Sequence, residues 1–214
     1  MLLNEDWNSS WMEYKDINKK KMIRHWKIFK FNEVPKDKKI IDIGCGTGEF
    51  LYLLKEKGFT NLKGIEFEEE LFINNDKEKL IEKGDCLDLS NIKEKYDIAC
   101  ILGVLHHLKN FEEMKVCLNE VRKILKKGGK FYSQEPWKNI IRTIVTKTIL
   151  ETPLRNIHSF FKIESKIWRI EKPLFTQWLN LEKKFTQYIL ESGFKIVFQK
   201  KRLRSRYIIF EKID

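Results

Sequence analysis

The chain has 214 residues, of which 42% are hydrophobic and 34% are charged, and this composition suits one soluble globular domain. No apolar run approaches the roughly 20 residues of a membrane span, and no signal peptide is visible. The four cysteines are widely spaced and lack a C-x-x-C pair, which predicts reduced thiols in a cytoplasmic protein rather than a disulfide framework. The net charge of +11 attracts anions such as nucleic acid or an anionic membrane surface, although a lysine-rich base composition explains it equally well.

The first 34 residues predict one or two helices ahead of the first strand. Trp7, Trp11 and Tyr14 recur at helical spacing, and an apolar and basic run covers residues 22–29. These helices either pack on the body of the domain or form a lid over a ligand site, and the pattern leaves both interpretations open.

A strand, a glycine turn and a helix come next. Residues 40–43 are apolar and β-branched apart from Asp42; Gly44, Gly46 and Gly48 follow, and the apolar run after them predicts a helix that ends near residue 58. A turn without Cβ atoms lets backbone N–H groups approach a ligand, and the helix N-terminus adds partial positive charge. The third glycine comes one residue early for the dinucleotide fingerprint, and there is no phosphate-binding lysine motif.

Two acidic residues stand near the predicted ends of the next strands. Glu66 closes a strand over residues 61–67, and it lies 18 positions after Gly48. An acid about 20 residues past such a turn is placed to accept hydrogen bonds from ribose hydroxyls. Asp85 follows Gly84 after a strand-like run, but Gly-Asp pairs also occur in ordinary turns.

The longest apolar run, residues 96–105, predicts a central strand that is buried on both faces of a parallel sheet. His106 and His107 close this strand. Asn110 is expected to cap the helix that follows, and a further strand is predicted over residues 130–136.

Residues 137–173 predict an insertion that leaves the ligand side of the sheet. An isoleucine-rich helical face over 140–149 precedes Phe160, Phe161 and Trp168. A substrate cover and a packed pair of side helices explain this segment equally well.

The C-terminal part predicts a helix over residues 176–192 and two strands, 194–198 and 206–210. The connection between the strands is too short for a parallel crossover, so we expect them to pair antiparallel. Together with the absence of an internal repeat or linker, these elements predict one domain over residues 1–214.

The glycine turn, Asp42-Ile-Gly-Cys-Gly-Thr-Gly, resembles the first motif of the class I S-adenosylmethionine-dependent methyltransferases. Gly84-Asp85-Cys86 resembles the third motif, and D-I-x-x-x-x-x-V-L-H-H-L, a helix and then L-K-x-G-G resemble the next segment of the family. The likeness covers roughly residues 39–135 and resumes near the C-terminus. It implies an α/β fold: a doubly wound, mostly parallel seven-stranded sheet with helices on both faces and an antiparallel last strand.

The same resemblance implies S-adenosylmethionine as the cofactor. Glu66 would hold the ribose, Asp85 the adenine amino group, and Arg24 the cofactor carboxylate. The implied cofactor-binding residues are Asp42, Gly44, Cys45, Gly46, Glu66, Asp85, Cys86, Leu102 and Arg24. His106 and His107 are the candidate catalytic residues, because a base is needed when the acceptor loses a proton. No histidine has an acid or cysteine partner at ligand spacing, so the sequence predicts no metal site.

Three functions compete for this chain. The motifs and the apolar insertion favour methyl transfer to a small-molecule or lipid-linked acceptor. The alternative is an RNA methyltransferase, which the net charge and the basic cluster at 200–206 favour. Against it, residues 102–105 read Leu-Gly-Val-Leu where enzymes that methylate exocyclic base amines carry [D/N]-P-P-[aromatic]. A non-catalytic module is third, because the intact glycines and acids argue for a retained cofactor.

Overall fold

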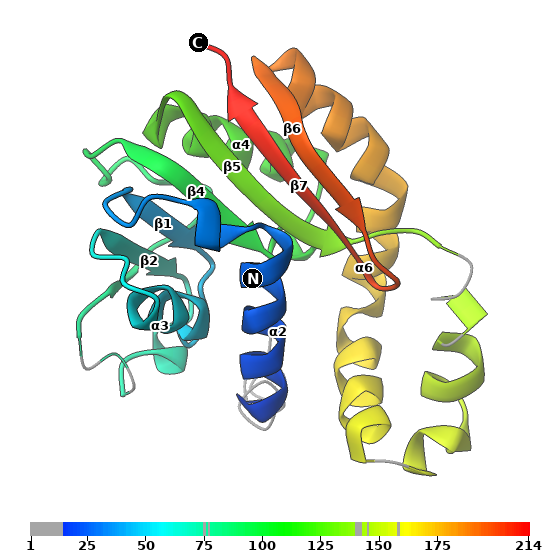
Figure 1. Cartoon of the computed structure of the whole chain (residues 1–214). Coiled ribbons are helices and arrows are strands. Elements are labelled where there is room, and N and C mark those ends of the chain that lie inside the picture. Colours follow the sequence, from blue (N-terminus) through cyan, green and yellow to red (C-terminus); the bar gives the residue numbers. More distant parts are fainter. Residues whose placement is uncertain (1–14, 75, 77, 140–142, 145, 158) are drawn as a thin grey trace.

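The computed structural model describes residues 15–74, 76, 78–139, 143–144, 146–157 and 159–214. The strands are β1 Ile40–Ile43, β2 Leu62–Glu66, β3 Ile81–Lys83, β4 Tyr96–Leu102, β5 Leu125–Pro136, β6 Phe194–Lys201 and β7 Ser205–Lys212. They form one seven-stranded sheet in the order β3-β2-β1-β4-β5-β7-β6 (Figure 1). β1 to β5 pair parallel, and β7 is antiparallel to both β5 and β6. The predicted mostly parallel sheet with an antiparallel last strand is therefore confirmed.

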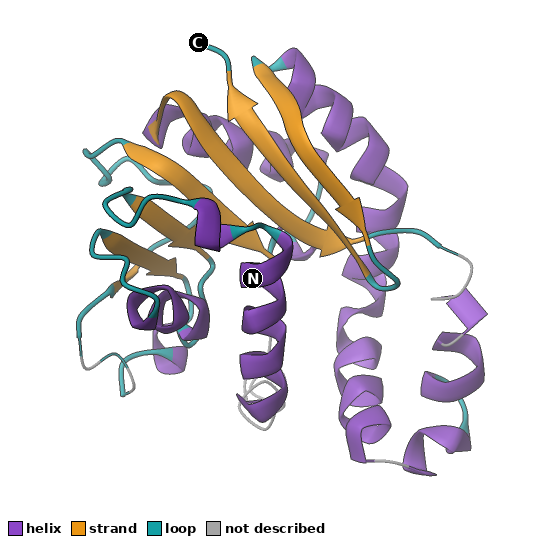
Figure 2. Cartoon of the chain, in the orientation of Figure 1, coloured by secondary structure: helices purple, strands orange, loops and turns teal. Residues whose placement is uncertain are grey.

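Helices cover both faces of this sheet (Figure 2). The helical elements are α2 Lys15–Ile28, η1 Phe31–Glu33, α3 Glu49–Glu56, η2 Glu69–Leu71, η3 Leu105–His107, α4 Phe111–Ile124, the π-helical η4 Thr146–Leu150, η5 Pro153–Ile157 and α6 Ser159–Glu191. Met22 of α2 and Leu54 of α3 belong to one apolar cluster, whereas Val121 of α4 and Phe185 of α6 belong to another. Two cores on opposite faces make the fold doubly wound, as the sequence predicted.

The central strand β4 belongs to both cores. Ile98 and Cys100 pack into the cluster under α2 and α3, and the alternate residues Ala99 and Ile101 pack into the cluster under α4 and α6. Because successive side chains of a strand point to opposite faces, a strand covered on both sides must be apolar throughout. This explains the unbroken apolar run in the sequence.

β4 ends at Leu102, three residues before the end predicted for it. Gly103 has a φ of +84°, a left-handed conformation that turns the chain out of the sheet, and its N–H donates to the carbonyl of Gln134 at 2.8 Å. The residues after this turn form η3, which presents His106 and His107 at the carboxyl end of the strand.

The predicted break between an insertion ending at Pro173 and a helix starting at Thr176 is wrong, because α6 runs through Pro173 as one helix. Proline in a helix interior removes a hydrogen bond and costs about 3 kcal/mol. Phe175, Trp178 and Phe185 are buried on α6. Each contributes about 1.5–3 kcal/mol on burial, which is enough to keep the helix continuous.

The isoleucine face predicted for the insertion is also not the buried one in the described residues. Ile144 is 54% exposed, whereas Thr146 and Leu150 are buried. The π-helical turn changes the residue period within Thr146–Leu150, so the 3.6-residue spacing predicted for residues 140–149 does not continue through this described part. The predicted positions that lie outside the described residues are Trp7, Trp11, Tyr14, Ile140, Ile141 and Val145.

Helix α2 confirms that a helix precedes the first strand. Met22 and Ile28 of α2 pack into the core on the α3 side of the sheet. In the part of the chain that the structure describes, no helix combines the length and apolar character needed to cross a bilayer.

Candidate functional site

The glycine turn between β1 and α3 requires its glycines. Gly44, Gly46 and Gly48 have φ angles of +70°, +58° and +80°, which side chains with a Cβ rarely adopt. A Cβ on Gly44 would also lie 2.5 Å from Cγ2 of Val104, so the turn and the segment after β4 approach each other too closely for any larger residue. Gly44, Cys45 and Gly46 of this turn line the cavity described below.

Glu66 sits at the last position of β2, as predicted, and is only 7% exposed. Its Oε2 accepts from the N–H of Gly46 at 2.7 Å, and its Oε1 accepts from Phe67 at 2.8 Å and Glu68 at 3.0 Å. Burial raises the pKa of this carboxyl, and the three backbone hydrogen bonds act against that rise. Glu66 thus ties the glycine turn to the end of β2.

Asp42 is the acid inside β1 and is 3% exposed. Burial raises its pKa to about 7, and the negative charges of Glu66 and Glu49 add to the effect. A carboxyl so perturbed gains most from a cationic partner, because a positive charge offsets both the desolvation and the repulsion.

Asp85 and Cys86 follow β3 in a turn. Oδ1 of Asp85 accepts from the N–H of Leu87 at 2.9 Å, which is the hydrogen bond of an ordinary Asx turn. The same two residues line the cavity described below. The turn conformation therefore presents them to the ligand side of the sheet.

Glu135, near the end of β5, fixes the histidine turn. Its Oε1 accepts from the N–H groups of Val104 at 2.9 Å and Leu105 at 2.8 Å, and its Oε2 lies 2.7 Å from Nδ1 of His106. Glu135 and His106 are 3% and 6% exposed. Because Nδ1 is taken by Glu135, the other ring nitrogen, Nε2, is directed away from it.

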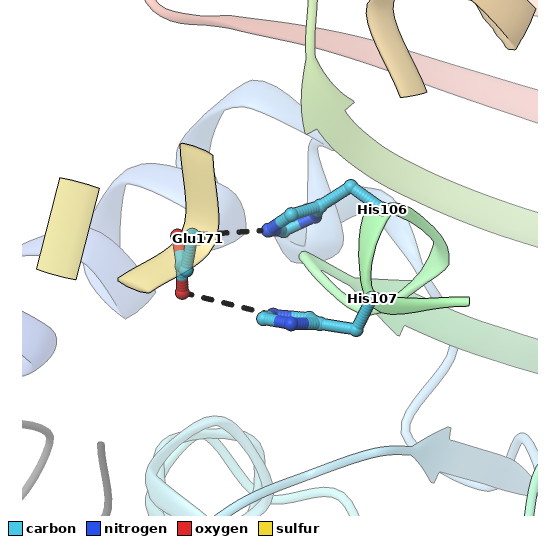
Figure 3. A group of neighbouring side chains, drawn as sticks. All are labelled: His106, His107 and Glu171. Carbon is cyan, nitrogen blue, oxygen red and sulfur yellow. Dashed lines mark ion pairs between the residues drawn. The ribbon is translucent and has the colours of Figure 1, made fainter. Parts of the chain in front are cut away.

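Glu171 of α6 faces both histidines (Figure 3). Its Oε2 lies 3.9 Å from Nε2 of His106, and its Oε1 lies 3.8 Å from Nε2 of His107. Burial would lower the pKa of His106, but Glu135 and Glu171 outweigh it and raise that pKa to about 9. Burial and the charge of His106 lower the pKa of His107 to about 3.

One cavity of about 750 Å³ joins these groups. The sequence-predicted residues that line it are Arg24, Asp42, Gly44, Cys45, Gly46, Glu66, Asp85, Cys86, Leu102, His106 and His107. Every predicted site residue therefore lies on the same cavity. Trp168, Glu171 and Phe175 of α6 line its other end, and α2 adds Lys21 beside Arg24.

Sequence reasoning missed Glu135 and Glu171. Glu135 ends a predicted strand, which was a usable signal, because ligands bind at the carboxyl ends of parallel strands. Glu171 gives no such signal, because only the path of α6 brings it to the histidines. His25 was missed as well: it lines the cavity, and neither of its buried ring nitrogens has a partner among the described residues.

These residues fit S-adenosylmethionine. Asp42, Glu66 and Asp85 offer carboxylates to a ligand that carries hydroxyl and amino donors and two positive centres. Gln134 lines the same cavity, and its buried Oε1 has no hydrogen-bond partner among the described residues, so an acceptor is available there. Arg24 supplies a cation that suits the ligand's carboxylate.

Comparison with known proteins gives a family and a fold. The family model described as Methyltransferase domain matches residues 14–190. The ubiquinone/menaquinone biosynthesis C-methyltransferase UbiE of Campylobacter jejuni subsp. jejuni is 32% identical over 105 residues, which are 44% of this chain and 43% of that enzyme. The chain thus spans less than half the length of this curated relative.

Solved structures have the same arrangement of elements. The PH0226 protein of Pyrococcus horikoshii OT3 superposes with a TM-score of 0.62 at 16% identity, covering 90% of both chains. The magnesium protoporphyrin IX methyltransferase ChlM of Synechocystis PCC 6803, solved with bound SAH, superposes with a TM-score of 0.60 at 16% identity, covering 91% of this chain and 83% of that one. With the family match and this fold, the chain belongs to the class I S-adenosylmethionine-dependent methyltransferases.

Proposed function

We infer that the protein transfers a methyl group from S-adenosylmethionine to a small-molecule or lipid-linked acceptor. The observation that carries this inference is the continuous cavity of about 750 Å³, which is lined by both the glycine turn and the histidines. Pockets for drug-sized ligands measure about 300–1,000 Å³, so the cofactor and the reactive part of an acceptor can share this space. The quinone pathway in the name of the Campylobacter relative supports an apolar acceptor.

The cofactor end needs no covalent chemistry from the protein. S-Adenosylmethionine supplies a methyl group that its sulfonium already activates, so the chain has to position the reactants and exclude water. Glu66 accepts from the ribose, Asp85 from the adenine amino group, and Arg24 pairs with the carboxylate. The glycine turn, with Asp42 and Cys45, surrounds the methionine part, and Cys86 and Leu102 contact the ring and the sugar.

The acceptor end is built from apolar walls around His106 and His107. Leu150, Trp168 and Phe175 line this part of the cavity. We assign the catalytic role to His106 and His107, because their Nε2 atoms face the cavity side where Glu171 stands. Glu135 is a positioning residue, because it holds Nδ1 of His106.

RNA is the second candidate acceptor, and the β6–β7 hairpin is the observation that favours it. Lys200, Lys201 and Arg202 are exposed there, and Leu203 and Arg204 at the turn border the cavity. A basic rim also suits the phosphate of a lipid-linked acceptor or an anionic membrane surface.

The thiols of all four cysteines are free, which supports a cytoplasmic location.

Labelled cofactor separates these functions. The purified protein is incubated with methyl-labelled S-adenosylmethionine and fractions of a cell extract, and binding of the cofactor is measured in parallel by calorimetry. We expect label in an organic-extractable or small-molecule fraction. Label in a fraction that ribonuclease destroys would make RNA the acceptor, and cofactor binding without any labelled fraction would favour a non-catalytic module.

A further inference from the structure

Three donor atoms of the kind that bind transition metals meet at the acceptor end of the cavity. A ring nitrogen of His106, a ring nitrogen of His107 and a carboxylate oxygen of Glu171 all lie within 4.8 Å of one another. The two imidazole rings are 4.2 Å apart between centroids and tilted by 35°, so their Nε2 atoms point the same way (Figure 3). The histidines come from η3 and the glutamate from α6, so two different layers of the fold supply the set.

The surroundings orient His106 as a ligand. Its Nδ1 lies 2.7 Å from Glu135, whose other oxygen accepts from two backbone N–H groups. Metal-bound histidines almost always donate their second N–H to a carboxylate or carbonyl, which fixes the ring and raises the basicity of the other nitrogen. Glu135 thus completes a carboxylate–histidine arrangement that leaves Nε2 available.

The distances and charges suit a divalent ion. In a tetrahedral zinc site with bonds of about 2.1 Å the donors stand about 3.4 Å apart. The nitrogen–oxygen distances of 3.9 and 3.8 Å run to different oxygens of Glu171, and the three donor atoms lie within 4.8 Å of one another, so the set has to close by up to about 1.4 Å. Closing the set requires rotation of the Glu171 side chain and of the imidazole rings. Glu135 and Glu171 also bring two carboxylates beside two buried imidazoles, and a dication that displaces the proton of His106 balances both negative charges.

We propose that His106, His107 and Glu171 bind a divalent transition-metal ion of the zinc type, with Glu135 as the outer partner of His106. Two histidines and a glutamate leave coordination positions open, which distinguishes catalytic zinc sites from closed structural ones. All three residues line the cavity, so the open positions face the space assigned to the acceptor.

The role of the ion rests on the proposed methyl transfer, whereas its binding does not. An acceptor oxygen or nitrogen that coordinates the ion loses its proton to water more easily. Its lone pair then forms the bond to the methyl carbon, and the pair of the broken carbon–sulfur bond stays on sulfur, which becomes a neutral sulfide. His106 and His107 act in this step by holding the ion.

Direct metal titration tests the site without any acceptor. Tag-free protein is treated with chelator and titrated with Zn²⁺ by calorimetry and with Co²⁺ by visible absorption. We expect one ion per chain, with a cobalt spectrum of nitrogen and oxygen ligands. Mg²⁺ should not compete, because it prefers oxygen ligands. Folded, cofactor-binding protein that takes up neither Zn²⁺ nor Co²⁺ would overturn the proposal.

Two glutamine variants locate the ion. Glu171→Gln should weaken Zn²⁺ binding by at least about tenfold, the lower end of the effect of losing even an outer partner. Glu151→Gln is the control, because Glu151 contacts α6 beside the cluster, through Lys172 at 2.7 Å and Trp168 at 3.2 Å, without facing the histidines. Equal Zn²⁺ affinity in the wild type and Glu171→Gln would place the ion elsewhere, for instance on cysteine, and overturn the proposal.

Two further readouts separate the site from the proposed function. Acetohydroxamate, a small oxygen ligand, should shift the cobalt spectrum if coordination positions are open; an unchanged spectrum would refute the acceptor role. S-Adenosylmethionine binding should be the same in Glu171→Gln and the wild type. Metal binding that persists in a protein unable to bind S-adenosylmethionine would refute the methyltransferase assignment and leave the metal site standing.

Discussion

Replacement of Glu66 by alanine is the sharpest test of the cofactor end of the cavity. The carboxylate already accepts three backbone hydrogen bonds, from Gly46, Phe67 and Glu68. A carboxylate offers about four lone-pair sites, so one is left for a ribose hydroxyl. A hydrogen bond to a charged group is worth about 1.5–3 kcal/mol, and about 1.4 kcal/mol is tenfold in affinity, so Glu66→Ala should weaken S-adenosylmethionine binding by about tenfold to 150-fold.

Calorimetry on the wild type, Glu66→Ala and Glu69→Ala provides the measurement. Glu69 lies on η2 beyond the end of β2 and pairs with Lys83 at the surface, with 45% of its side chain exposed, so Glu69→Ala should bind the cofactor normally. Urea unfolding must accompany the titration, because the alanine also leaves the N–H groups of Gly46, Phe67 and Glu68 without this acceptor. Unchanged affinity in a folded Glu66→Ala protein would refute the placement of the ribose at β2.

Two more predictions concern the same end of the cavity. Gly46→Val should bind no S-adenosylmethionine in calorimetry, because the φ of +58° at Gly46 and the approach of the ligand both exclude a branched side chain. Gly58→Val is the control: Gly58 has a similarly strained φ of +90° but faces open space after α3, so this variant should still bind the cofactor. Affinity should rise about tenfold per pH unit up to about pH 7 and then level off, because the pKa of Asp42 is raised to about 7 and only its ionised form attracts a cation. Asp42→Asn should flatten this profile; an unchanged slope would assign the titration to another group.

The parallel half of the fold could be predicted because local signals agree with the tertiary structure there. The apolar run of β4, the glycine turn after β1 and the acid at the end of β2 each have a local cause, and each occurs where it was expected. Asn110 caps α4 by accepting from the N–H of Glu113 at 2.9 Å, as the spacing of these residues indicated.

The covering segment could not be predicted because packing decides it against local propensity. Pro173 favours a helix end, yet α6 continues through it, since the buried aromatic residues of its C-terminal half outweigh the lost hydrogen bond. Residues 146–150 adopt a π-helical turn, and no sequence period announces that geometry.

Glu135 and Glu171, the two acids beside the histidines, could not be predicted for the same reason: tertiary structure decides where they lie. Glu135 meets His106 because β4 and β5 are neighbouring strands, and the register that aligns Leu102 with Gln134 follows from the sheet, not from the local sequence. Glu171 depends on the unforeseen continuity of α6. Spacing along the chain therefore gives no sign of the group of His106, His107 and Glu171, which forms only in three dimensions.

Helix α6 is anchored in the protein core at one end and lines the acceptor part of the cavity at the other, so a tilt at the core displaces residues at the cavity. Its buried anchor is Phe185, and Trp178 adds a hydrogen bond from Nε1 to the carbonyl of Pro136 at 2.8 Å. Glu171 lies 14 residues before Phe185, which is about 21 Å along a helix, so a tilt of about 5° at the anchor moves it by about 2 Å. Proline interrupts the hydrogen-bond ladder of a helix, so Pro173 is the position at which the segment that carries Trp168 and Glu171 can bend. Small changes of packing far from the cavity can thus retune which acceptor fits it.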